Sequence, residues 1–445
     1  MADWVDFVHG LRLADIPEPV RRRALACLLD LAGVAASGRQ TSVSRIVHDF
    51  AAAHQLGGRH GARMIFDGRR VSLPGAAMAG AATIDSYDAH DGHRLTKGHA
   101  GVVVLPALLA LEDEMAPSRD GAEFLVRLVL GYEIANRAGI ALHATVPDYH
   151  TSGAWNALAA AAIAARALGF DRATTRHALG TAEFYGPRSQ MMRCIDFPTM
   201  VKDGSTYGGQ VGLSAALLAQ DGFSGAPAIS VEADNAAAFW GDLGSRWRIL
   251  EQYFKPWPIC RWAQPAVAAA QALRAQAAGR AIERVRIRTF HAAARLDVRE
   301  PQDSDAAQYA LPFPTAAMLA HGVVDGATVT TGLRDERTLA MARRIVTETD
   351  PELDAMFPAR RVAIVEVTLA DGTVLVSPPT EARGDPEDPL SEAELRAKAE
   401  ASLVPRVGPA RHAALAAEID ALGGGGGARR LVEMLLTPLR DAEGN

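Results

Sequence analysis

Apolar side chains recur at helical spacing through most of the first 270 residues, and this pattern predicts a mainly helical region. The segment 157–167 is apolar on nearly every side because alanine fills most of its positions, and such a helix is normally buried. Asp67-Gly68 separates two short runs, 62–66 and 70–73, and predicts a small hairpin. The predicted helices span residues 18–36, 42–54, 73–87, 100–114, 119–145, 152–168, 172–184, 204–221 and 264–278.

The pattern changes near residue 280, where apolar and polar residues begin to alternate. This alternation predicts half-buried strands, followed by a return to helical spacing. We therefore expect a mainly α protein, with a large all-helical domain and a smaller inserted α/β lid domain. The predicted strands are 282–290, 362–369 and 373–377, and the predicted helices are 312–321, 339–346, 391–402, 409–422 and 429–436. The expected boundaries are 1–268 for the first part of the helical domain, 269–388 for the lid, and 389–445 for the C-terminal part of the helical domain.

Composition and charge exclude several classes of protein. Of the 445 residues, 49% are hydrophobic and 22% are charged, which is typical of a globular chain. The formal net charge of −6 gives no reason to expect binding to nucleic acid or to an anionic membrane. Three cysteines are too few for a disulfide framework, and no apolar stretch reaches the roughly 20 residues of a membrane span. Acidic residues stand where a signal peptide would be positively charged, so we expect a cytoplasmic protein.

Titratable residues are most crowded between two apolar helices, in the segment 84–106. It contains Asp85, His90, Lys97 and His99, together with further acids, and groups packed so closely shift one another's pKa. Residue types alone leave three alternatives: a solvated polar loop, a metal site of histidines and carboxylates, or metal-free acid/base chemistry. The segment has neither an HExxH motif nor a Cys-His zinc spacing, so we expect no metal.

Three other segments carry candidate residues for binding an anion. His150 precedes the alanine-rich helix, where Thr151 or Ser152 is expected to cap the helix. Lys202 precedes glycine-rich turns and a helix start, without the spacing of a nucleotide-binding loop. Lys255 and Arg261 lie on a proline-stiffened segment at the expected domain junction. An incidental histidine in a capping loop, or ordinary surface charge, would explain each of these segments equally well.

Four sequence blocks, in this order, resemble the MmgE/PrpD family over nearly the whole chain: GHAGVVVLPALLAL, YHTSGAWNALAAAAIAARALGFD, MVKDGSTYGGQVGLSAALLAQDGFSG and KPWPICRWAQPAVAAAQAL. The family includes 2-methylcitrate dehydratase, cis-aconitate decarboxylase and iminodisuccinate epimerase. The resemblance implies a helical domain with an α/β lid, a homodimer, and no metal or organic cofactor. The chain departs from the family pattern at Tyr87, Ala89, Gln264 and Phe313.

The resemblance and the residue types together define an expected site. Its catalytic residues are Asp85, His99, His150 and Lys202, and its substrate-binding residues are Lys255, Arg261, His90, Lys97 and Tyr207. The expected function is that of a cofactor-independent lyase, a dehydratase or decarboxylase, that moves protons on a small anionic di- or tricarboxylate. Two alternatives remain: an epimerase or isomerase of an amino- or imino-dicarboxylate, and an inactive paralogue that binds carboxylates.

Overall fold

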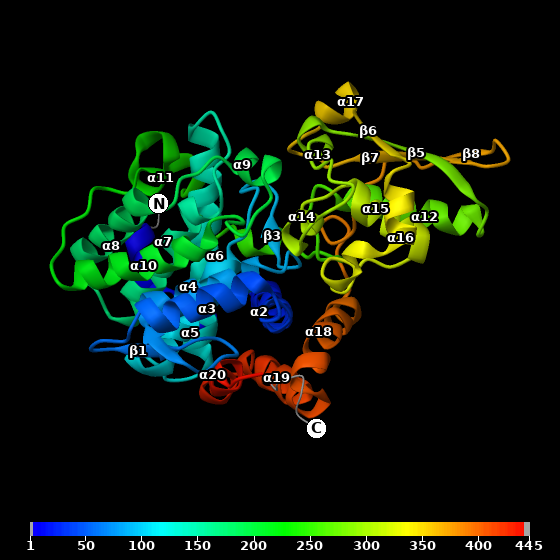
Figure 1. Cartoon of the computed structure of the whole chain (residues 1–445). Helices are drawn as coiled ribbons and strands as arrows, with labels where there is room; N and C mark the ends of the chain where they lie inside the picture. Colours follow the sequence, from blue (N-terminus) through cyan, green and yellow to red (C-terminus); the bar gives the residue numbers. More distant parts are fainter. Residues whose placement is uncertain (1–2, 440–445) are drawn as a thin grey trace.

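Helices dominate the computed structural model, which describes residues 3–439, and the protein is mainly α as predicted (Figure 1). The alanine-rich helix α7 (Gly153–Ala167) lies at the centre of the helical part. It packs against the surrounding helices α5, α6, α8 and α10, and its residues 153–165 are all buried, as its composition predicts. The other helices of this part are α2 (Glu18–Gly38), α3 (Ser42–His54), α4 (Leu73–Asp85), α5 (Gly101–Ala110), α6 (Gly121–Thr145), α8 (Arg172–Tyr185) and α10 (Ser205–Gln220).

The small hairpin is present as the antiparallel strands β1 (Gly61–Arg63) and β2 (Arg70–Ser72). Helix α5 is shorter than predicted, because five residues at its end, Leu111–Met115, form a π-helical turn. Helix α4 ends at Asp85, two residues before the predicted end. The three cysteines are unpaired and buried. Among residues 3–439, no helix has the combination of length and apolar character that crossing a membrane requires.

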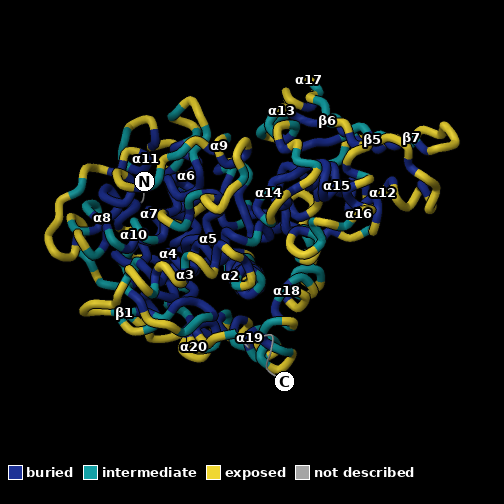
Figure 2. The backbone as a smooth tube through the Cα atoms, in the orientation of Figure 1, coloured by how far each residue is buried: buried dark blue, intermediate teal, exposed yellow. Residues whose placement is uncertain are grey.

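A second hydrophobic core forms around a four-stranded sheet with strand order β6-β5-β7-β8. The strands are β5 (Ile282–Thr289), β6 (Ile345–Thr349), β7 (Ala363–Leu369) and β8 (Val374–Val376), and only β5 and β6 of this sheet run parallel. Helices α12 (Gln264–Ala277), α15 (Pro312–His321) and α16 (Glu336–Ala342) pack with this sheet or with one another. Figure 2 shows buried backbone around α15 as well as among the helices of the first core.

The helix predicted over 339–346 is wrong at its C-terminal end. Helix α16 ends at Ala342, and Ile345 begins strand β6. The side chains of this segment are largely β-branched, and its backbone pairs in parallel with β5, about 60 residues earlier in the chain. Such distant pairing overrides the local helical pattern.

The last helices pack back against the first core. Helix α18 (Glu392–Val407) lies along α2, and α19 (Pro409–Leu422) and α20 (Arg429–Leu436) continue the same core. The two cores meet where β3 (Gly92–His93) faces α14 (Ser304–Gln308) (Figure 1). The domain boundaries expected near residues 268 and 388 stay a prediction.

Candidate active site

The acidic loop, defined here as residues 85–99, is mostly buried, with Leu95 as its one exposed residue. It begins where α4 ends, and α5 begins two residues after it. In its middle, β3 pairs antiparallel with β4 (Gln252–Tyr253), with Gly92 opposite Tyr253. This pairing brings a segment more than 150 residues away against His99. The alternative of a solvated polar loop is therefore wrong.

Ser152 connects the acidic loop to two other segments of the site. Its hydroxyl accepts a hydrogen bond from the backbone N–H of His99 at 2.9 Å and donates one to the Asp203 carboxylate. Ser152 takes the N-cap position of α7, but its side chain makes no capping hydrogen bond, and the Thr151 hydroxyl donates to the Pro187 carbonyl. The side-chain cap predicted from Thr151 or Ser152 is therefore wrong. A side chain at Gly98 would collide with the Ser152 hydroxyl and the Trp155 ring, so only glycine allows the loop to approach this closely.

His99 has one ring nitrogen fixed by the backbone. Its Nδ1 lies 2.7 Å from the carbonyl oxygen of Asp91, and because a carbonyl only accepts, Nδ1 carries the proton. Burial, together with the Lys255 ammonium, lowers the pKa of His99 to about 3. No residue in the described range 3–439 makes a hydrogen bond to Nε2. A neutral imidazole with an unprotonated Nε2 is the form required of a general base.

His90 packs edge-on against His99, with 4.2 Å between the ring centroids. Its Nε2 lies 3.4 Å from Asp88 Oδ1, and both of its ring nitrogens are buried without a hydrogen-bond partner among the described residues. Burial, followed by the effect of His99, lowers the pKa of His90. Its ring is therefore neutral, like that of His99.

Asp88, His90 and His99 are the described residues whose ligand atoms lie close enough together, within 4.8 Å, to hold a metal ion. Two imidazoles and a carboxylate are a suitable donor set for a transition metal. However, the Lys255 ammonium already contacts Asp88 Oδ1, at a position where it competes with a cation for the same oxygen. A metal at this point would also meet the repulsion of a buried positive charge.

Asp85 and Asp203 form a second group of interacting buried acids. The backbone N–H of Asp203 donates to Asp85 Oδ2 at 3.3 Å, and both side chains are buried. Burial raises the pKa of Asp85, and burial together with Asp85 raises the pKa of Asp203. Two such carboxyl groups resist being ionised together, so the pair retains a proton that it can donate.

Lys202 and Lys255 are the cations nearest to these acids, and both are buried and paired. Lys202 Nζ lies 2.9 Å from Asp305 Oδ1 and donates to Gln308 Oε1 at 3.2 Å. Lys255 binds Asp88 and lowers the pKa of that carboxyl against the effect of burial. Asp305 and Gln308 belong to α14, so Lys202 connects the first part of the chain to the second.

The backbone marks two of the lysines as unusual. Among the described residues only four non-glycine residues have a positive φ, and two of them are Lys97 (52°) and Lys202 (46°). This left-handed conformation is unfavourable for a residue with a side chain, and such residues gather at functional sites. The backbone conformation thus singles out Lys97 and Lys202 by a property that cannot be read from the sequence.

Four of these side chains, Asp88, Lys97, His99 and Lys255, line a small cavity of about 20 Å³, which is room for about one water molecule. Asp85, His90, Lys202 and Asp203 belong to the same buried cluster but do not line this cavity. A carboxylic acid substrate is larger than this cavity, so its binding requires the surrounding side chains or segments to move. Four residues of this wall belong to the expected site: Lys97, His99, Lys255 and Arg261. The other seven do not: Asp88, Met191, Tyr253, Cys260, Trp262, Tyr309 and Arg361.

Other expected site residues have different surroundings. Arg261 lines the cavity, but its two terminal nitrogens bond to Gln264, Asp385 and two backbone carbonyls, so this arginine fixes the wall. His150 does not line the cavity; it pairs with Asp148 at 3.4 Å and stacks on His143. Tyr207 is exposed on α10 and is also absent from the wall.

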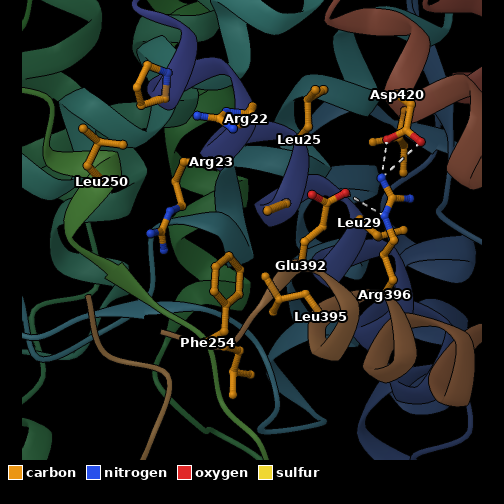
Figure 3. Close-up of a pocket in the computed structure, with 14 residues that line it drawn as sticks. Arg22, Arg23, Leu25, Leu29, Leu250, Phe254, Glu392, Leu395, Arg396 and Asp420 are labelled. Atoms are coloured by element: carbon orange, nitrogen blue, oxygen red, sulfur yellow. Dashed lines mark hydrogen bonds and ion pairs between the residues drawn. The ribbon is translucent and has the colours of Figure 1, made fainter. Parts of the chain in front are cut away.

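A larger pocket of about 400 Å³ lies between α2 and α18, away from the acidic loop (Figure 3). Its floor is apolar, with Leu25 and Leu29 among the lining residues, and Arg396 at its edge bonds to Glu392 and Asp420. No histidine lines it. The smaller cavity therefore has the chemistry of an active site, and the larger pocket lacks a comparable base.

Comparison with known proteins assigns the chain to two neighbouring domain families. The MmgE/PrpD N-terminal domain matches residues 2–241, and the MmgE/PrpD C-terminal domain matches residues 257–422. The cis-aconitate decarboxylase-like protein oryM of Aspergillus oryzae is 28% identical over 233 residues, which are 50% of this chain and 47% of that protein. The match thus spans about half the length of this curated relative.

Proposed function

The chain belongs to the MmgE/PrpD family, and from this premise we propose that it is a lyase that transfers protons on a small di- or tricarboxylate. The reaction is a dehydration or a decarboxylation. The name of the Aspergillus relative, a cis-aconitate decarboxylase-like protein, supports this class of chemistry. The proposal requires no metal or organic cofactor.

The observation that carries the proposal is the state of His99. Its Nδ1 is bonded to a backbone carbonyl, its pKa is lowered to about 3, and its ring lines the cavity. Burial has the opposite effect on the nearby Asp85, because it raises the pKa of that carboxyl group. A neutral imidazole can accept a proton, and a carboxyl group whose pKa is raised can donate one, so the two groups offer the two roles of acid/base catalysis.

In a dehydration, His99 Nε2 takes a proton from the carbon next to a substrate carboxylate. The Lys255 and Lys202 ammonium groups stabilise the negative charge that develops on that carboxylate. The carboxyl pair of Asp85 and Asp203 then gives its proton to the leaving hydroxyl, and the carbon–oxygen bond breaks to release water.

In a decarboxylation, the bond to one carboxylate breaks and carbon dioxide leaves. The electron pair stays on the carbon and is stabilised by the same ammonium groups, and the Asp85–Asp203 pair protonates that carbon. Both reactions need the same cations and the same acid, so the same buried cluster serves either one. His99 is needed as a base in the dehydration and as a positioning group in the decarboxylation.

Proton NMR in deuterated water tests the proposal. Citrate, 2-methylcitrate, cis-aconitate and iminodisuccinate are each incubated with the enzyme. A new olefinic product that forms with loss of carbon dioxide indicates decarboxylation, and one that forms without this loss indicates dehydration. Either product supports a lyase. Deuterium incorporation with inversion, and no elimination, would instead support an epimerase. Binding without any exchange or product would support an inactive paralogue. The homodimer and the cytoplasmic location stay predictions.

A further inference from the structure

Five cationic side chains lie in or beside the cavity wall, and three of them are matched by carboxylates. Lys202 pairs with Asp305, Lys255 with Asp88, and Arg261 with Asp385. The remaining two are Lys97 and Arg361, and neither has an ion pair with any carboxylate of the described residues 3–439. The wall therefore has two positive charges more than its partners neutralise.

Arg361 is the more unusual of the two. Only 4% of it is exposed, and its Nε and Nη1 are buried without a hydrogen-bond partner in the described chain. Its Nη2 donates to the backbone carbonyl of Arg94 at 3.3 Å, and its guanidinium lies 5.3 Å from the centre of the Tyr253 ring. A buried guanidinium with free N–H groups is unfavourable unless something accepts those bonds.

Lys97 approaches the same cavity from the acidic loop. Its ammonium lies 4.0 Å from the centre of the Tyr149 ring, and its backbone has the left-handed conformation. Burial and the nearby charge of Arg361 lower the pKa of Lys97 to about 8. The two cations thus repel each other, and an anion between them would offset that repulsion.

We propose that Arg361 and Lys97 together bind a substrate carboxylate remote from the carbon at which the proton is transferred. Arg361 supplies the planar fork of Nε and a terminal nitrogen, which matches a carboxylate in two places. Lys97 supplies a second charge. The inference rests on the proposed function and narrows it: the substrate has at least two carboxylates, one held near Lys255 and one at Arg361.

The two residues come from different parts of the chain. Lys97 belongs to the acidic loop, whereas Arg361 lies just before strand β7 of the second core. A carboxylate held by both residues therefore connects the two parts of the chain. A second carboxylate near Lys255 adds a further contact, which an acid with a single carboxylate cannot make at the same time. This gives a physical reason for selectivity by number of carboxylates.

Binding of non-reacting acids tests the inference without turnover. Dissociation constants of glutarate and butyrate, which differ by one carboxylate, are measured by calorimetry for the wild type, Arg361→Gln and Lys97→Gln. We expect wild type to prefer glutarate, and Arg361→Gln to lose roughly 10- to 100-fold in glutarate affinity with little change for butyrate. Arg360→Gln is the matched control, because Arg360 is adjacent and half-exposed and pairs with Glu381 outside the cavity.

Equal losses for both acids, or no loss in either variant, would overturn the inference, and so would a wild type that does not prefer glutarate. Arg361→Lys keeps the charge and is expected to recover part of the affinity, which separates charge from a folding defect. The proposed function fails in a different way, since wild type would then show no exchange or product with any acid while still preferring glutarate.

Discussion

The Nδ1 atom of His99 lies 2.7 Å from the backbone carbonyl oxygen of Asp91, and this single contact decides which ring nitrogen can act on a substrate. A carbonyl cannot donate, so the proton stays on Nδ1 and Nε2 is the accepting atom. Asn156 and Ser152 hold the backbone of His99 from the other side, through its carbonyl and its N–H. The base is therefore positioned mainly by backbone contacts.

Replacing His99 by glutamine keeps a polar side chain of similar length but removes the base. We expect turnover to fall by roughly 10²–10⁴-fold in a dehydration, as is usual for the loss of a general base. The measurement is steady-state turnover with the best substrate from the NMR screen. His60→Gln, at an exposed histidine, is the control. Activity of His99→Gln within a few-fold of wild type would remove His99 from the mechanism.

The low pKa of His99 makes a prediction about acid pH. Because burial and Lys255 hold that pKa near 3, the ring stays neutral at neutral pH and well below it. We expect kcat/KM to show no decline with an apparent pKa near the usual histidine value of about 6.5. A decline centred there would contradict the geometry.

Stability must be followed in the same experiment. In the unfolded chain His99 takes up a proton below about pH 6.5, whereas folded His99 does not until about pH 3. The unfolded state therefore binds more protons in this window, and His99 lowers the free energy of unfolding as the pH falls through it. Circular dichroism at each pH shows whether a loss of activity is only a loss of folded enzyme.

The lowered pKa of Lys97 leads to a prediction for alkaline pH. Its pKa is lowered to about 8 by burial and by Arg361, so above that pH the free enzyme loses the ammonium charge. We expect KM to rise by up to about tenfold per pH unit above pH 8, because the substrate carboxylate loses a partner. Lys97→Arg stays charged throughout this range, and we expect it to abolish the rise. The same rise in both enzymes would assign it to another group.

Lys255 and Asp88 form a buried ion pair, which gives a prediction about stability. Lys255→Met leaves the Asp88 carboxylate buried without its cation, and we expect the free energy of unfolding to fall by about 3–5 kcal/mol. The double variant Lys255→Met/Asp88→Asn removes both charges and should regain most of that loss without regaining activity. Urea unfolding measures both. Recovery of activity in the double variant would show that the pair is only structural.

Local pattern was sufficient to predict most of the helices. The alanine-rich segment of α7 and the heavily apolar segment of α5 are recognisable because their own residues decide how they are buried. Strand β6 was not recognisable, because its partner β5 is distant in the sequence. Local spacing contains no information about that pairing.

The same limit applies to the site. Asp85, His99, Lys202 and Lys255 were predicted from motifs, and the structure places them in one buried cluster, although their roles stay proposals. The burial of the acidic loop could not be predicted, because the cation that balances Asp88 lies 167 residues later. Arg361 belongs to no motif, and nothing in its neighbourhood distinguishes it from Arg360 until the fold brings it to the cavity wall.

The central claim is that this cavity performs proton transfer on a polycarboxylate. Its most direct test is proton NMR of cis-aconitate and 2-methylcitrate in deuterated water, followed with wild type and with His99→Gln under identical conditions. The account predicts that wild type forms product or incorporates deuterium at the carbon next to a carboxylate, and that His99→Gln is slower by at least about 100-fold in the dehydration. Absence of exchange and product in wild type, or equal rates in the two enzymes, would contradict it.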